Sequence, residues 1–129
     1  YEGCLKEIPV ETHMQLAAEA DSATLLSSNG IIFGTPENFG YMSGALKDFF
    51  DRTFYQVEHK NINIPYCTFV SAGNDGTGAV SSIERIASGY PLIKVAEPLI
   101  ISGKQVNSNK KRCIDFGHGM AAGLALGIY

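Results

Sequence analysis

Apolar residues follow two different spacings within residues 30–54. Residues 30–33 form a short apolar run, whereas apolar side chains recur at helical spacing over residues 42–54. A continuous apolar run predicts a strand covered on both faces, and helical spacing predicts a helix with one face against a sheet. Gly34 and Pro36 are expected to end the strand, and Ser43 is well suited to cap the helix. The stretch therefore reads as strand, loop and helix.

The same two patterns continue along the rest of the chain. The predicted elements are a strand over residues 8–16, a short helix that Asp21 or Ser22 caps, a strand over residues 66–71, a helix over residues 80–87 that Gly89 and Pro91 end, a strand within residues 92–101 that Pro98 interrupts, a loop over residues 103–109 and a closing helix over residues 110–127. Alternating strands and helices predict a parallel sheet with right-handed crossovers, hence a three-layer α/β sandwich. We expect residues 1–129 to form one domain, because a chain of this length buries one core.

Composition narrows the classes of function. The chain is 45% hydrophobic and 18% charged, and its formal net charge is −3. These values are typical of globular domains, and a small negative charge does not favour binding to nucleic acid. No apolar run approaches the roughly 20 residues of a membrane span, and no export signal opens the chain. The three cysteines stand at unrelated positions, which suits reduced thiols. We therefore expect a cytoplasmic protein that does not associate with membranes.

Two loop segments follow predicted strands: residues 35–40, which contain Pro36 and Gly40, and the glycine-rich residues 73–78. In open parallel sheets the carboxyl ends of the strands form the ligand crevice. The first segment offers an aromatic ring, a hydroxyl and an amide, which suit a flat heteroaromatic ligand; alternatively, Phe39 only packs over the following helix. The second segment resembles an anion site at a helix N-terminus. It lacks the Lys-Ser/Thr end of a phosphate loop, however, and Asp75 would repel an anion, which favours a second wall of the same crevice.

Other catalytic arrangements are disfavoured. Ser71 follows a predicted strand as a hydrolase nucleophile does, but Phe69 stands where that pattern requires glycine. Asp115 and His118 are expected one turn apart on one helix, a placement that does not suit a proton relay. The histidines are expected to be exposed or hydrogen-bonded, and no metal-ligand spacing is present in the sequence.

Residues 34–52 resemble the flavodoxin-like superfamily. Within it they are most similar to the branch of NAD(P)H-dependent FMN reductases and multimeric quinone reductases that resemble tryptophan-repressor-binding protein A. That branch has Gly-Thr/Ser-Pro, then a short loop with Phe-Gly and Met-Ser, then Leu-Lys-x-Phe-x-Asp-Arg, and all of these parts occur here in order. Residues 69–78 resemble the family's next loop, and residues 117–127 resemble its C-terminal helix.

The resemblance implies an FMN site and a redox reaction. Hydride would pass from NAD(P)H through FMN to a quinone or similar small electron acceptor, and because this chemistry is the cofactor's own, no catalytic side chain is implied. The residues expected along one side of the flavin ring are Thr35, Pro36, Glu37, Asn38, Phe39 and Gly40, and those along the other side are Ser71, Ala72, Gly73, Asn74, Asp75 and Gly76. The family also implies a homodimer or homotetramer.

One part of the family pattern is not in the sequence. The family begins with a central strand and a Ser/Thr- and Gly-rich loop that binds the FMN phosphate. In the flavodoxin-like strand order 2-1-3-4-5, that strand lies between the strands predicted for residues 8–16 and 30–33. We expect the sequence to be N-terminally incomplete, because an empty position would leave unpaired backbone groups in the middle of the sheet. A flavodoxin-type electron carrier and a flavin-free interaction domain of the same fold are the alternatives.

Overall fold

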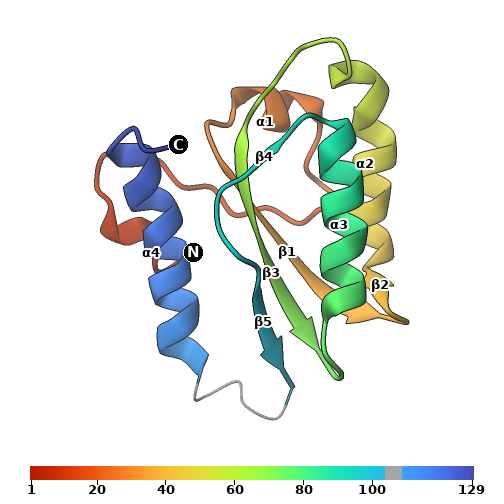
Figure 1. Ribbon diagram of the computed structural model, residues 1–129. Coiled ribbons are helices and arrows are strands. Elements are labelled where there is room, and N and C mark those ends of the chain that lie inside the picture. Colours follow the sequence, from red (N-terminus) through yellow and green to blue (C-terminus); the bar gives the residue numbers. More distant parts are fainter. Residues whose placement is uncertain (104–108) are drawn as a thin grey trace.

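The computed structural model describes residues 1–103 and 109–129 (Figure 1), so most of the predicted loop over residues 103–109 lies outside the described residues. The elements in chain order are η1 (Cys4–Lys6), α1 (Ser22–Ser27), β1 (Ile31–Asn38), β2 (Tyr41–Met42), α2 (Gly44–Val57), β3 (Pro65–Ala72), α3 (Thr77–Gly89), β4 (Ile93–Lys94), β5 (Leu99–Ser102) and α4 (Lys110–Ala125). The strands predicted at residues 30–33, 66–71 and 92–101 and the helices that follow them are therefore confirmed.

Strands β1 and β3 form the centre of a five-stranded, mostly parallel sheet. Their register runs from Ile31 opposite Tyr66 to Pro36 opposite Ser71. Strand β3 also pairs in parallel with β4 near its start and with β5 near its end, and the break between β4 and β5 contains Pro98, as predicted. The carboxyl ends of β1, β3 and β5 consequently lie at the same edge of the sheet (Figure 1).

Helices α2 and α3 cover one face of the sheet with an aromatic core (Figure 1). The ring of Phe33 on β1 lies 5.1 Å from that of Phe50 on α2, centroid to centroid. The Ser43 hydroxyl caps α2 by accepting a hydrogen bond from the Leu46 amide at 3.3 Å, which confirms the predicted start of this helix. Asp21 caps α1 in the same way, accepting from the Thr24 amide at 2.8 Å. The capping signals at Asp21 and Ser43 thus predicted the starts of α1 and α2 correctly.

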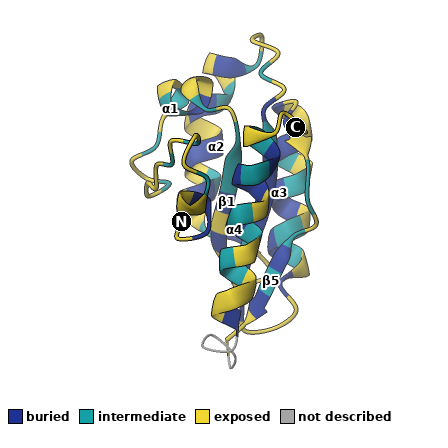
Figure 2. Cartoon of the chain, turned by 90° about the vertical axis from the view of Figure 1, so that its left-hand side faces the viewer, coloured by how far each residue is buried: buried dark blue, intermediate teal, exposed yellow. Residues whose placement is uncertain are grey.

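Helix α4 lies on the opposite face of the sheet and packs against η1 (Figure 1). Gly3 makes this packing possible, because a Cβ atom at Gly3 would stand 2.0 Å from the Ile114 carbonyl oxygen. The Cys4 thiol donates to the Gly117 carbonyl at 3.3 Å, and His118 Nε2 lies 2.7 Å from the Glu7 carboxylate. His118 is thus hydrogen-bonded, as predicted. Figure 2 shows this side of the molecule, with α4 in front of the sheet.

The strand predicted for residues 8–16 is wrong, because this segment is irregular and leaves Ile8 94% and Met14 76% exposed. Alternating apolar residues favour an extended segment, but a strand also needs a hydrogen-bonded neighbour. Among the described residues, the edge of β1 that faces away from β3 is paired with another strand only at Glu37 and Asn38, which meet β2. The rest of that edge is where the resemblance places a further strand, and an incomplete sequence stays a prediction.

Candidate functional site

The segment predicted as a loop over residues 35–40 is the end of a strand and a tight hairpin. Strand β1 continues through Gly34 and Pro36 to Asn38, so the prediction that these two residues end it is wrong. Pairing with β3 continues through Pro36. Proline is tolerated there because, among the described residues, the edge of β1 that faces away from β3 has no strand partner at Pro36. Phe39 and Gly40 then turn the chain into β2 with φ values of 53° and 71°, the positive values that a two-residue type I′ turn requires.

Phe39 stands at the tip of this hairpin. Its side chain is fully exposed, with a relative accessibility of 108%, so the alternative in which it packs over the following helix is wrong. Its positive φ is unusual for a residue other than glycine and costs on the order of 1 kcal/mol. An exposed aromatic ring on a strained turn contributes nothing to the core. It is available to a ligand.

Thr35 and Glu37 point toward the helices and hold the hairpin in place. Thr35 is buried; its hydroxyl accepts a hydrogen bond from the Ser43 amide at 2.9 Å and donates to the Pro36 carbonyl at 2.9 Å. Glu37 is half-buried, and its Oε1 accepts from the amides of Gly78 at 3.0 Å and Ala79 at 3.3 Å. These amides belong to the first turn of α3, so Glu37 connects the two predicted walls of the crevice.

The second wall begins at the end of β3. Gly73, Asn74 and Asp75 are exposed, and a Cβ atom at Gly73 would meet nothing within 4 Å. The Asp75 carboxylate accepts from the amide of Thr77 at 3.0 Å and from its hydroxyl at 2.8 Å, and these hydrogen bonds lower the pKa of Asp75. Gly76, with a φ of 74°, packs under Ile100 and is the N-cap residue that precedes α3.

The predicted site residues divide between the two faces of the sheet, because successive side chains of a strand point in opposite directions. Thr35 and Ala72 are buried on the side of α2 and α3. Pro36 and Ser71 are register partners on the other face, and both are exposed. Asn38, Phe39 and Asn74 continue this exposed surface at the carboxyl edge. We call Pro36, Asn38, Phe39, Ser71, Gly73 and Asn74 the open edge.

The open edge fits a flat heteroaromatic ring. Pro36 and Phe39 provide apolar surfaces, and Asn38, Ser71 and Asn74 provide hydrogen-bonding groups for a polar rim. A phosphate group fits less well beside it, because the amides at the start of α3 already donate to protein carboxylates. The structure thus places apolar surfaces and free hydrogen-bonding groups at the open edge, while the first amides of α3 already donate to protein carboxylates.

Two contacts of the hairpin were not predicted. A Cβ atom at Gly78 would lie 2.0 Å from the Gly40 carbonyl oxygen, so only glycine allows this approach of α3 to the turn. The Met42 amide donates to the Ser82 hydroxyl at 3.2 Å, and Ser82 donates in turn to the Ala79 carbonyl at 2.8 Å. Gly78 was visible as part of a glycine-rich segment, but no sequence signal distinguishes Ser82 from other helical serines.

Hydrolase chemistry has no support in the geometry. Asp115 pairs with Lys111 at 2.5 Å and His118 with Glu7, while Ser71 lies on the sheet surface. Across residues 1–103 and 109–129, no group of three or more His, Cys, Asp and Glu side chains is arranged to hold a metal ion. Within the same residues, no helix combines the length and apolar character needed to cross a membrane.

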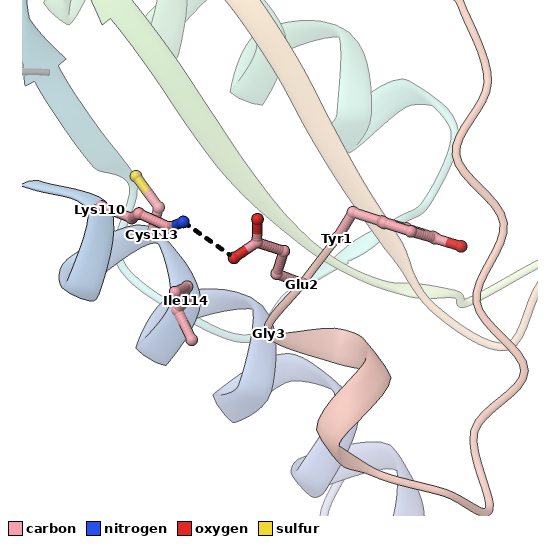
Figure 3. A pocket seen from close by; sticks show the side chains of 6 residues that line it. All are labelled: Tyr1, Glu2, Gly3, Lys110, Cys113 and Ile114. Carbon is pink, nitrogen blue, oxygen red and sulfur yellow. Dashed lines mark ion pairs between the residues drawn. The ribbon is translucent and has the colours of Figure 1, made fainter. Parts of the chain in front are cut away.

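A hollow of about 290 Å³ lies between the first residues of the chain and the start of α4 (Figure 3). It is lined by Tyr1, Glu2, Gly3, Lys110, Cys113 and Ile114. Glu2 and Lys110 form an ion pair across it at 3.5 Å. The hollow shares no residue with the open edge.

Comparison with solved structures confirms the flavodoxin-like α/β fold. A flavodoxin from the domain Archaea superposes with a TM-score of 0.72 at 15% sequence identity, covering 93% of this chain and 81% of that one. A flavodoxin, WrbA-like protein from Agrobacterium tumefaciens gives a TM-score of 0.67 at 17% identity, covering 78% of this chain and 68% of that one. A flavone reductase gives 0.70 at 15% identity, covering 95% of this chain and 56% of that one. At these identities the likeness concerns the fold alone.

Sequence comparison narrows the fold to a family. The chain is 47% identical over 49 residues to an NAD(P)H dehydrogenase (quinone) of Acidithiobacillus ferrooxidans (strain ATCC 53993 / BNL-5-31). That match covers 38% of this chain and only 24% of the relative, so the chain spans a small part of its length. The family model described as NADPH-dependent FMN reductase matches residues 3–106, which include both segments predicted to line the ligand site. The chain therefore belongs to the NADPH-dependent FMN reductase family.

Proposed function

We propose that this protein is an FMN-dependent oxidoreductase that transfers hydride from NAD(P)H, through bound FMN, to a quinone or similar small acceptor. The observation that carries the proposal is the open edge, where the exposed register partners Pro36 and Ser71 and the exposed ring of Phe39 lie at the carboxyl ends of parallel strands. Membership of an FMN reductase family implies FMN and a nicotinamide co-substrate.

In this proposal each residue of the open edge has a role in binding. Phe39 and Pro36 contact the apolar part of the flavin ring, and Ser71, Asn38 and Asn74 bond to its polar rim, with the exposed backbone at Gly73 beside them. FMN, when bound, supplies the hydride chemistry, and the chain orients the ring and sets the charge around it. This division of labour accounts for a site without a nucleophile or a proton relay.

The quinone as acceptor is supported by the relative from Acidithiobacillus ferrooxidans, whose described activity is that of an NAD(P)H dehydrogenase (quinone). That support is local, because the matched segment has 49 residues. The nicotinamide and the acceptor would use the solvent side of the bound ring. A homodimer or homotetramer, which the family resemblance implies, is proposed along with the activity, and light scattering of the purified protein tests it.

The decisive experiment is reconstitution of the full chain with FMN, followed by assays of turnover. Co-elution of visible flavin absorbance with the protein and steady NADPH or NADH oxidation that depends on added quinone are expected. Bound FMN without quinone-dependent turnover would instead identify an electron carrier. No flavin binding at high micromolar FMN would contradict the proposal and favour an interaction domain of the same fold.

A further inference from the structure

The hairpin that carries Phe39 is attached to α3 by three separate contacts. The Glu37 carboxylate accepts hydrogen bonds from the first-turn amides of Gly78 and Ala79 at 3.0 Å and 3.3 Å. The backbone at Gly40 packs against Gly78, and the Met42 amide donates to Ser82. Because the hairpin and α3 are far apart in the sequence, these contacts fix where the tip of the hairpin lies.

The hairpin needs such support. Its ladder has only two residue pairs, Glu37 with Met42 and Asn38 with Tyr41. A two-stranded ribbon of this length is marginal in water, and Phe39 adds backbone strain at the turn. Among the three contacts, the carboxylate is the one made by a charged group. Hydrogen bonds to charged groups contribute more than neutral ones, so Glu37 should be the strongest of the three.

The same carboxylate controls charge at the start of α3. A helix N-terminus carries a partial positive charge and unsatisfied amides, which attract anions. Here Glu37 takes the amides of Gly78 and Ala79, and Asp75 takes that of Thr77. With protein carboxylates already bound there, this end of the helix repels a phosphate and leaves the uncharged ring as the part of FMN that the neighbouring open edge can accept.

We propose that Glu37 is a positioning residue: its carboxylate holds the Phe39 hairpin against the N-terminus of α3 and closes that terminus to anions, so that this wall of the crevice binds the flavin ring and not the phosphate. The attachment of the hairpin to α3 rests on contacts within the chain. The selection of the flavin ring over the phosphate rests on the proposed function.

Three variants of the full chain separate the hydrogen bonds from the charge. Glu37→Ala removes the acceptor, Glu37→Gln keeps an Oε1 that can accept from both amides, and Glu19→Ala removes an exposed glutamate from the segment before α1 as a control. Hydrogen exchange of the Gly78 and Ala79 amides, measured by NMR without flavin, reports the attachment directly. Titrations with lumiflavin, which has the ring but no phosphate, and with FMN report the site.

We expect Glu37→Ala to lower the protection of both amides and the affinity for lumiflavin by about tenfold or more, the scale of one charge-assisted hydrogen bond. Glu37→Gln should restore part of the protection, because its amide oxygen can accept the same hydrogen bonds without the charge, and Glu19→Ala should match the native chain. The ratio of FMN to lumiflavin affinity should rise when the charge is removed in Glu37→Gln, because the start of α3 then repels phosphate less.

Distinct results would overturn each half. Unchanged protection in a folded Glu37→Ala variant would overturn the attachment. Lost protection with unchanged lumiflavin affinity, or an unchanged affinity ratio in Glu37→Gln, would overturn the role at the ring. If the native chain binds neither flavin, the proposed function and the ring half fail together, while the exchange data still decide the attachment. If Glu37→Ala does not fold, Glu37→Asp, one methylene shorter, replaces it and should lose the same protection.

Discussion

Gly78 lies against the Gly40 carbonyl so closely that a Cβ atom at Gly78 would stand 2.0 Å from that oxygen. The Gly78→Ala substitution must therefore push the hairpin away from α3 or deform the helix. We expect a loss of about 1 to 3 kcal/mol in the free energy of unfolding, the usual cost of overpacking, together with weaker flavin binding. Urea unfolding measures the first effect and FMN titration the second.

Gly119→Ala is the matched control for that substitution. Gly119 lies on the exposed side of α4, and a Cβ atom there would meet nothing within 4 Å. Alanine in a helix is favoured over glycine by about 0.5 to 1 kcal/mol, so Gly119→Ala should stabilise the chain. Equal effects of the two substitutions would contradict the close approach at Gly78.

Phe39→Gly should separate stability from binding. The Phe39 ring is fully exposed, and its φ of 53° suits glycine better, so the unfolding free energy should stay the same or rise by up to about 1 kcal/mol. Flavin affinity should fall about tenfold, because the apolar surface of the open edge is lost. Tyr55→Ala, which removes an exposed ring on α2, should change neither quantity much. Loss of stability without loss of flavin affinity would refute the role given to Phe39.

Tyr90→Phe tests the polar contact inside the core. The buried Tyr90 hydroxyl donates to the Phe50 carbonyl and lies 2.9 Å from the Thr53 hydroxyl. Its removal leaves buried acceptors without that partner, so we expect the free energy of unfolding to fall by about 1 to 2 kcal/mol. Thermal or urea unfolding measures this change. Tyr55→Phe, at a side chain that is 80% exposed, should be neutral. A neutral Tyr90→Phe would mean that the contact adds nothing to stability.

The buried thiol of Cys67 predicts that the free energy of unfolding depends on pH in the alkaline range. Burial raises the pKa of the Cys67 thiol from an ordinary 9.0 to about 12. The folded state therefore keeps the proton that the unfolded state releases, so this contribution to stability is complete below pH 9.0 and declines as the pH rises toward 12. Cys67→Ala should weaken that alkaline decline.

In the native chain at pH 8 the half-buried Cys113 should react with a thiol reagent well before Cys67. Rapid native labelling of Cys67 would contradict its burial.

The charge of Asp75 is expected to affect the midpoint potential of bound FMN. Hydrogen bonds from Thr77 lower the pKa of Asp75, so it stays ionised beside the open edge and should disfavour an anionic reduced flavin. Asp75→Asn keeps a side-chain acceptor but removes the charge, and should raise the two-electron midpoint potential of bound FMN by on the order of 10 to 30 mV. Asp115→Asn is the control, because Asp115 is on α4 and not part of the open edge, and its pKa is likewise lowered, by a hydrogen bond from Lys111. A lower potential in Asp75→Asn would refute the electrostatic role.

Local signals in the sequence predicted the helices and central strands because those signals act over a few residues. Ser43 and Asp21 cap helices that begin next to them, and the apolar run of residues 31–33 lies in a strand covered by helices. The hairpin was missed because Phe39-Gly40 lacks the Asn-Gly or Asp-Gly pair that usually marks such a turn. The strand over residues 8–16 was predicted wrongly because alternation says nothing about whether a partner strand is present.

The two segments of the candidate site could be predicted from the sequence. The directions of their side chains and the contacts between them could not. Strand alternation divides Thr35 and Ala72 from Pro36 and Ser71, and that division follows only once the strand limits are known. The role of Glu37 depends on a hydrogen bond to Gly78, 41 residues away, which no local pattern reveals. Family resemblance pointed to the carboxyl edge of the sheet, and the structure shows which of the residues at that edge are exposed.

The edge of β1 that faces away from β3 has a consequence for self-association at high protein concentration. Along residues 31–36 its backbone has no strand partner among the described residues, and Ile8, Met14 and Leu16 are exposed elsewhere on the chain, at 94%, 76% and 67%. An unpaired strand edge is a template on which another strand can be added, and exposed apolar side chains favour association between chains. Self-association should therefore grow with protein concentration, and lysine or proline placed on that edge should act as a gatekeeper against aggregation.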